Sequence, residues 1–238
     1  MMRLVTIIAF VLCLPAQSPD AIQQADRLFS YGEDPARDRR ALELIERAMP
    51  SQANSYQLLW RASRAYYHVG DDAPSKEKLN YYERGIDAGR RAVALEPGRA
   101  EGHFWLGANY GGVGEQKGAF KALQLIGKIR AEMETVVRLN PGYEDGNGYL
   151  ALCELDRQLP RLLGGNTTRS IAYCEQGLRL APRNLELKLA LAKGYLEAGR
   201  RDDARRQLQE ILPQQINPER ARAERGLQDE ARRMLGAM

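Results

Sequence analysis

The residue types that enzymes use for catalysis are few in this sequence and do not form known catalytic patterns. The only histidines are His68 and His103, which are far apart in the chain. The sequence contains no HExxH or CxxC, the spacings that commonly hold a transition metal. It also lacks the GxSxG turn of serine hydrolases and the phosphate-binding P-loop. We therefore predict a protein that is not an enzyme and that uses no metal or other cofactor.

One glycine-rich stretch has the composition of a phosphate-binding loop. Gly111–Gly118 reads GGVGEQKG, and main-chain N–H groups in such loops bind phosphate where a strand leads into a helix. Here the preceding residues have the periodicity of a helix, and the GxGxxG spacing is absent. We therefore predict that this stretch is a flexible connection between two helices.

Cysteine chemistry is limited to Cys153 and Cys174, the two cysteines that follow the N-terminal segment. We expect each to lie in a helix and to face the seam between the two helices. In an oxidising compartment such a pair can form a disulfide. The alternative is that both are small, buried apolar side chains.

Residues 1–16 have the composition of a secretory signal peptide. Arg3 is the only charged residue among them, and Leu4–Leu14 is a continuous apolar run, shorter than a membrane span. Ala16 is a small residue suited to signal peptidase. We predict a bacterial protein that is periplasmic or secreted, begins near Gln17 and is not inserted in a membrane after cleavage. The alternative is a signal that is kept as an anchor.

The composition is that of a soluble protein with a core: 44% of the residues are hydrophobic and 28% are charged. The net charge is only +4, and acidic and basic residues alternate along helical segments such as RRDDARRQLQE. This alternation is typical of solvated helix faces. Because no basic block with interleaved aromatic residues is present, we predict no nucleic-acid binding.

The clearest local pattern is a helical hairpin over residues 178–212. Asn184 is a candidate N-cap, and the apolar residues that follow it recur along one helix face. Gly199 stands where a left-handed residue ends a helix. Small residues at Ala192 and Ala204 allow two helices to approach closely. A hairpin this short has too little apolar surface to be stable alone, so it must stack on similar units.

Earlier copies of the phrase that opens this hairpin supply these units. With Pro97, Pro141 and Pro182 in register, a large residue follows nine positions later and a small one ten positions later. The pairs are Leu106 and Gly107, Leu150 and Ala151, and Leu191 and Ala192. A fainter copy begins at Pro50. Each phrase indicates the end of one helix, a proline and a new helix.

These residues resemble the tetratricopeptide repeat (TPR) family over most of residues 20–212. The large and small pair, the aromatic Tyr110 or Tyr195 one turn later and the alanine of the second helix all match its pattern. The prolines are 41 to 47 residues apart, whereas the family period is about 34 residues. The resemblance therefore implies an all-α, TPR-like α-solenoid of stacked hairpins with long helices and inserted loops.

The long helices, GHFWLG at residues 102–107 and LPRLLGGN at 159–166 also resemble a narrower group. It is the exported T component of the tripartite ATP-independent periplasmic (TRAP) transporters. The helical domain of regulators of microtubule dynamics has a similar layout. The resemblance covers roughly residues 36–212 and implies a periplasmic accessory that works beside a substrate-binding protein.

We predict three segments: a signal peptide over residues 1–16, a TPR-like repeat domain over 17–212, and a C-terminal capping helix over 213–238. Stacked hairpins form a concave groove lined mainly by first helices, so we expect protein–protein interaction there. The groove candidates are Arg61, Arg64, Glu101, Phe104, Lys193 and Glu197. Phe104 is the candidate apolar anchor. We expect a protein or peptide partner; the alternative is a small apolar ligand enclosed in a channel.

Overall fold

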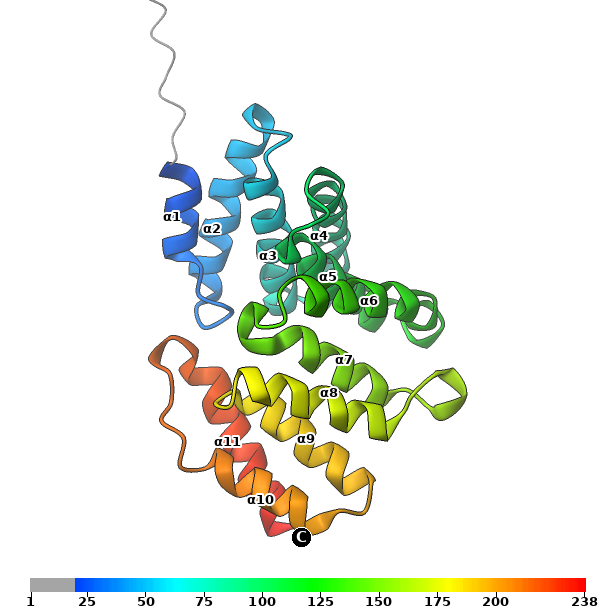
Figure 1. The fold of residues 1–238 in the computed structure, drawn as a ribbon. Coiled ribbons are helices and arrows are strands. Elements are labelled where there is room, and N and C mark those ends of the chain that lie inside the picture. Colours follow the sequence, from blue (N-terminus) through cyan, green and yellow to red (C-terminus); the bar gives the residue numbers. More distant parts are fainter. Residues whose placement is uncertain (1–19) are drawn as a thin grey trace, which may run out of the picture.

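The computed structural model describes residues 20–238 and contains eleven α-helices and no strand in this range (Figure 1). The helices are α1 (Asp20–Leu28), α2 (Pro35–Ala48), α3 (Tyr56–Asp72), α4 (Ser75–Leu95), α5 (Ala100–Lys117), α6 (Ala119–Leu139), α7 (Asn147–Gln158), α8 (Thr167–Leu180), α9 (Leu185–Glu197), α10 (Arg201–Ile211) and α11 (Ala221–Gly236). Short 3-10 turns at Met49–Ser51, Tyr143–Gly146, Arg161–Leu163 and Pro218–Arg220 join some of them. The predicted all-α class is confirmed.

The helices form a continuous stack of antiparallel hairpins. Each helix from α1 to α11 packs against the next one along the chain (Figure 1). Two pairs of first helices from successive hairpins also pack together: α3 contacts α5, and α7 contacts α9. This is the nearest-neighbour arrangement of a solenoid, so the predicted TPR-like architecture is confirmed.

The C-terminal hairpin forms at the residues that the sequence indicated. The Asn184 side chain accepts a hydrogen bond of 3.0 Å from the Leu187 N–H and so caps α9. Gly199 has a φ of 75°, a left-handed conformation that ends the helix and that residues with a Cβ rarely adopt. Ala192 and Ala204 are fully buried where α9 meets α10. Local sequence therefore sets both ends of α9.

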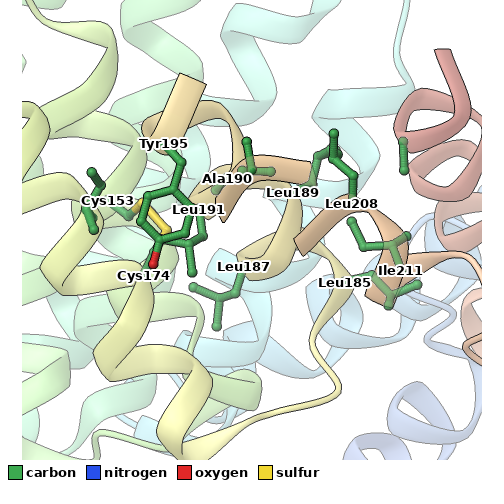
Figure 2. Close-up of a cluster of buried hydrophobic side chains, with 14 residues drawn as sticks. Cys153, Cys174, Leu185, Leu187, Leu189, Ala190, Leu191, Tyr195, Leu208 and Ile211 are labelled. Carbon is green, nitrogen blue, oxygen red and sulfur yellow. A yellow bond between two sulfur atoms is a disulfide. The ribbon is translucent and has the colours of Figure 1, made fainter. Parts of the chain in front are cut away.

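The core of the C-terminal half lies between α7, α8, α9 and α10 (Figure 2). Leu187 and Leu191 of α9 are buried at its centre, and the Tyr195 ring lies beside Leu191. Cys153 of α7 and Cys174 of α8 are joined by a disulfide with Cα atoms 5.5 Å apart. Of the two interpretations of this cysteine pair, the structure has the bonded one.

The predicted glycine loop at residues 111–118 is wrong, because α5 continues to Lys117. Its glycines allow close packing rather than flexibility. A Cβ on Gly112 would lie 2.6 Å from the Tyr82 ring, and one on Gly114 would lie 3.3 Å from the Ala122 backbone. The connection between α5 and α6 consists of Gly118 alone, which has a φ of 78°. Burial of neighbouring side chains here outweighs the low helix propensity of glycine.

The connection between α3 and α4 is also short. α3 ends at Asp72 and α4 starts at Ser75, so that only Ala73 and Pro74 join them. The C-terminal helix occupies part of the predicted segment 213–238. In the structure, Pro218–Arg220 is a 3-10 turn capped by Asn217, and α11 begins at Ala221.

The helix α11 covers one end of the stack and also reaches the other end. Gln228 is buried and donates hydrogen bonds to backbone carbonyls after α10, including that of Gln214 at 2.9 Å. At the start of α11, the Glu33 carboxylate accepts the N–H groups of Arg222 at 2.8 Å and Ala223 at 3.0 Å. A carboxylate at a helix N-terminus is favourable. The α1–α2 connection and α11 therefore lie side by side (Figure 1).

The predicted signal peptide, residues 1–16, lies outside the described residues. Within residues 20–238, no helix combines the length and apolar character needed to cross a membrane.

Candidate functional site

A cavity of about 740 Å³ lies where the first helices face the inside of the curved stack. Residues of α3, α5, α6, α7 and the start of α9 line it, and the α1–α2 connection and the start of α11 border it. We call this cavity the chamber. Contact between Glu33 and α11 makes it more enclosed than an open solenoid groove.

Aromatic rings form one wall of the chamber. The Tyr67 ring lies 5.8 Å from that of Trp105 and 6.0 Å from that of Tyr82, measured between ring centroids. Phe104 packs edge-on against Trp105 at 4.9 Å. Tyr31 completes the wall at the border with the α1–α2 connection. Ring faces of this kind bind apolar groups and also cations.

Apolar side chains of α6 and α7 form the floor, among them Ile129, Met133, Leu150 and Leu155. The α5 backbone approaches the chamber directly at Gly111, where an added Cβ would have no atom within 4 Å. The chamber therefore has free volume next to a main chain that carries no side chain.

Carboxylates outnumber cations around the chamber. Its acidic lining residues are Glu33, Asp71, Asp72, Glu115, Glu144, Glu154 and Glu186, and its basic ones are Arg220 and Arg222. The Glu186 carboxylate pairs with Arg220 at 3.0 Å, and that of Glu154 pairs with Arg157 at 2.6 Å. The chamber thus has an acidic surface although the whole chain has a net charge of +4.

Five of these acids have no ion pair within residues 20–238: Glu33, which accepts backbone N–H groups of α11, and Asp71, Asp72, Glu115 and Glu144. Partial desolvation by neighbouring atoms raises the pKa of the Glu115 carboxyl, and the nearby Asp71 charge raises it further. Burial also raises the pKa of Asp72 and of Glu144. A positive charge placed in the chamber would stabilise the ionised form of each.

His68 stands among the aromatic rings and is neutral near pH 7. Burial first, and then the Arg64 charge, lower its pKa to about 3. Its Nε2 atom is buried without a hydrogen-bond partner in the described structure. The ring lies 5.3 Å from those of both Tyr67 and Trp105. His68 therefore adds a ring face and no positive charge.

Among the six predicted groove residues, only Phe104 lines the chamber. It is 9% exposed and its ring also lies 5.3 Å from that of Tyr143. Arg61 and Arg64 both point to Asp26 of α1, each with a nitrogen–oxygen distance of 2.8 Å. Arg64 is buried, which a groove side chain would not be.

The other three predicted residues are also paired within the fold. Glu101 binds Arg99 at 2.7 Å, Lys193 binds Glu230 of α11 at 2.9 Å, and Glu197 binds Arg157 of α7 at 2.8 Å. They do not gather with Phe104 on one surface. A role for these residues in partner binding stays a prediction.

The acids at the ends of α3 and α5 are not among the candidate residues that the sequence indicated. Glu115 lies in the stretch predicted as a glycine-rich connection, and no motif singles out Asp71 and Asp72. Extending the helical period would have found them, because Tyr67 and Asp71 are four residues apart, as are Gly111 and Glu115. Each pair then lies on one helix face.

Both ring nitrogens of His103 are bound within the fold. Its Nδ1 lies 2.6 Å from a Glu132 carboxylate oxygen and its Nε2 lies 2.9 Å from the Pro97 carbonyl oxygen. The part of the chain that the structure describes has no group of three or more His, Cys, Asp or Glu side chains placed to hold a metal ion.

Two family models match different parts of the chain. The model described as "Regulator of microtubule dynamics protein 1-3" matches residues 21–146, which is more than half of the sequence. The chain belongs to this family. A second model, tetratricopeptide repeat, matches residues 162–227. The regulator of microtubule dynamics match thus covers α1 to α6, and the TPR match covers α8 to α10 and the start of α11.

Solved structures of TPR proteins have the same fold. A thermophilic TPR protein of Thermus thermophilus, TTC0263, superposes with a TM-score of 0.65 at 22% identity, over 89% of this chain and 97% of that one. MamA AMB-1 has a TM-score of 0.55 at 18% identity, over 82% and 95%. MamA 41-end from Desulfovibrio magneticus RS-1 has a TM-score of 0.54 at 15% identity, over 80% and 93%. At these identities the likeness concerns the fold alone.

A comparison with curated protein sequences finds no significant match.

Proposed function

We propose that this protein is a non-catalytic interaction protein whose chamber receives a segment of a partner protein. The observation that carries the proposal is the chamber itself, which presents aromatic rings and unpaired carboxylates to free volume. A tightly packed protein core has no free volume beside its aromatic rings and contains no unpaired carboxylates. TPR folds serve as protein-interaction scaffolds, and the concave side is the surface that such solenoids use.

The size and openness of the chamber suit a short stretch of chain. Its volume of about 740 Å³ falls in the range of ligand sites, about 300–1,000 Å³. Asp71 and Glu115 are exposed, so that the chamber is reached from solvent along the ends of α3 and α5. A partner segment can enter there and extend across Gly111 toward Leu150.

We also propose that the protein is exported, most simply to a bacterial periplasm. The signal-like composition of residues 1–16 supports this, and the Cys153–Cys174 disulfide suits an oxidising compartment. N-terminal sequencing of the protein from the cell envelope should find a chain that begins near Gln17. A chain that retains Met1 there would contradict cleavage.

A second candidate function is that of a small-molecule-binding accessory of a TRAP-type transporter. The observation that favours it is the partial closure of the chamber by α11 and Glu33, together with the apolar floor. An accessory of this kind would bind an isolated small ligand without any partner segment. Binding experiments with protein segments and small molecules separate the two functions.

Site-specific photocrosslinking tests the first function. A photoreactive phenylalanine analogue replaces Gly111, whose missing side chain faces the chamber, and in a control protein it replaces Gly127 of α6. Both positions are helical and have no atom within 4 Å of an added Cβ. A protein that crosslinks to position 111 but not to 127, and that Gly111→Leu no longer binds, supports the proposal. A partner that crosslinks only at 127 contradicts it.

A further inference from the structure

The ends of α3 and α5 carry the wrong charge for helix stability. Asp71 and Asp72 are the last two residues of α3, and Glu115 lies in the last turn of α5. The C-terminus of a helix carries a partial negative charge, so a cationic side chain is favourable there and a carboxylate is not. The three carboxylates at these two helix ends are therefore unfavourable, although Lys117 in the last turn of α5 and the Lys78 ammonium at the end of α3 offset part of the cost. Such a cost is expected where the charges serve binding.

The fold places no cation in ion-pair contact with these carboxylates within residues 20–238. Of the chamber's two arginines, Arg220 pairs with Glu186, and the Arg222 guanidinium lies near the Gly32 carbonyl, at 3.4 Å. Lys78 donates to the Asp71 backbone carbonyl, and the Lys78 and Arg222 charges lower the pKa of Asp72 by less than burial raises it. A ligand can therefore bring a cation into direct contact with these carboxylates.

The rings beside the carboxylates have the complementary property. The Tyr67 ring stands near Asp71 and Glu115 and carries no positive charge of its own, and the fully buried Tyr82 ring packs behind it. Aromatic faces attract ammonium and guanidinium groups, and the attraction is stronger when water is excluded. A cation here would contact ring faces and carboxylates together.

The same arrangement suits an organic cation better than a metal ion. The acids are spread along the mouth, and in residues 20–238 no set of them converges as a metal site does. Beyond the mouth, Ile129 and Leu150 provide apolar surface. Lysine and arginine side chains have an apolar stem and a charged end, and so they match both parts.

We propose that the chamber is selective for lysine or arginine side chains on an extended segment of the partner protein. This inference rests on the proposed function and specifies its ligand. The protein itself has a net charge of +4, so general attraction between opposite charges would not draw a basic segment to it. Selectivity would come from the acidic chamber.

The test measures binding of short capped peptides to the purified protein by calorimetry at physiological salt. In one peptide lysine alternates with glycine. In a second, norleucine replaces each lysine and keeps the carbon chain without the charge. Spermidine is the small-molecule probe. We expect the lysine peptide to bind at least about tenfold more tightly than the norleucine peptide, and more tightly than spermidine.

Two variants locate the binding. Asp71→Asn with Glu115→Gln should weaken the lysine peptide at least about tenfold. The control, Asp202→Asn with Glu43→Gln, removes the same two charges from exposed helix positions and should change affinity by less than roughly twofold. Because the first pair relieves repulsion, its melting temperature should not fall below that of the unchanged protein. Gly111→Leu, which fills the chamber and keeps every charge, should also abolish binding.

The outcomes separate the inference from the proposed function. Equal or tighter binding of the norleucine peptide, lost in Gly111→Leu, would overturn the cation selectivity and leave the chamber as a segment-binding site. If spermidine binds more tightly than the lysine peptide, the ligand of the chamber is a small cation and not a protein segment, and the inference is overturned. A lysine peptide that binds Asp71→Asn/Glu115→Gln as well as the unchanged protein overturns the inference. Failure of the crosslinking test at position 111 would overturn the proposed function itself.

Discussion

Replacing Asp156 with alanine should destabilise the stack, because this carboxylate joins three helices, α6, α7 and α8. Asp156 lies on α7 and its side chain is fully buried. Arg130 of α6 donates to its Oδ1 at 2.5 Å, and Arg169 of α8 donates to the same oxygen at 2.6 Å and to Oδ2 through Nε. The alanine variant leaves two guanidinium groups without their shared carboxylate.

The size of the effect follows from burial. Removing one member of a buried charged group costs about 3–5 kcal/mol. Arg169 is 43% exposed and can regain water, which places the expected loss at about 2–3 kcal/mol. In a chain of this length each kcal/mol changes the melting temperature by about 2–4 °C. The variant should therefore melt about 5–10 °C lower.

The effect should also depend on pH with a known sign. Burial alone would raise the pKa of Asp156, but hydrogen bonds from Arg169 and Arg130 outweigh it and hold the pKa below its ordinary value. The ion pairs therefore stabilise the fold fully above about pH 4 and lose this effect as the pH falls through the lowered pKa. The stability gap between the unchanged protein and Asp156→Ala should close only in acid.

Differential scanning calorimetry near pH 7 checks the magnitude. The matched control is Asp229→Ala on α11, whose carboxylate is 60% exposed and pairs with Arg232 at 2.5 Å. An exposed pair contributes about 0–1 kcal/mol, so this control should melt within about 4 °C of the unchanged protein. Equal melting temperatures for the two variants would refute the view that Asp156 holds α6, α7 and α8 together.

Three further predictions concern single positions. Leu191→Asp, at a site that is 2% exposed, should cost several kcal/mol in calorimetry, whereas Lys193→Asp should cost about 1 kcal/mol; equal losses would contradict the α9 register. Gly111→Ala should raise the melting temperature slightly and Gly112→Ala should lower it, because only the second Cβ meets a tyrosine ring; the reverse order would contradict the packing of α5. The hydrogen bond that the His103 ring donates to the Glu132 carboxylate raises the pKa of His103, so its stabilising contribution is full below about pH 6.5 and is lost as the pH rises through the raised pKa. The stability gap to His103→Gln in urea titrations should therefore be larger at the acidic end of this range, and a gap that does not change with pH would contradict it.

Helix positions near residues 178–212 could be predicted because local signals set them. The Asn184 cap, the apolar stripe through Leu191 and the left-handed Gly199 each act within a few residues of the chain. The all-α solenoid followed from repetition of the same phrase. No distant contact is needed to explain these features.

The groove charges could not be placed in the same way. Helical periodicity shows that Arg64 and Lys193 share a face with other first-helix residues, but it does not show which distant side chain meets them. Arg64 binds Asp26, 38 residues earlier, and Lys193 binds Glu230 on the last helix. Because carboxylates of other hairpins pair with these two cations, the cations are not free on the predicted groove surface.

The chamber could not be predicted from the sequence for a related reason. Glycine has low helix propensity, so GGVGEQKG indicated a loop and removed Glu115 from any helix face. In the structure the ring of Tyr82 on α4 packs against Gly112 and keeps the segment helical. That contact joins residues about one hairpin apart, and only the folded arrangement shows it.

The contact between Glu33 and the start of α11 changes how the two ends of the repeat array unfold. In an open array, a terminal hairpin can unfold without affecting the opposite terminus, because stabilising contacts form only between neighbouring repeats. Here hydrogen bonds span 189 and 190 residues and link the first connection to the last helix. Amide hydrogen exchange at Gly32, whose N–H is held by Asp38, should therefore report loosening of α11 some 190 residues away, as a cooperative unit would.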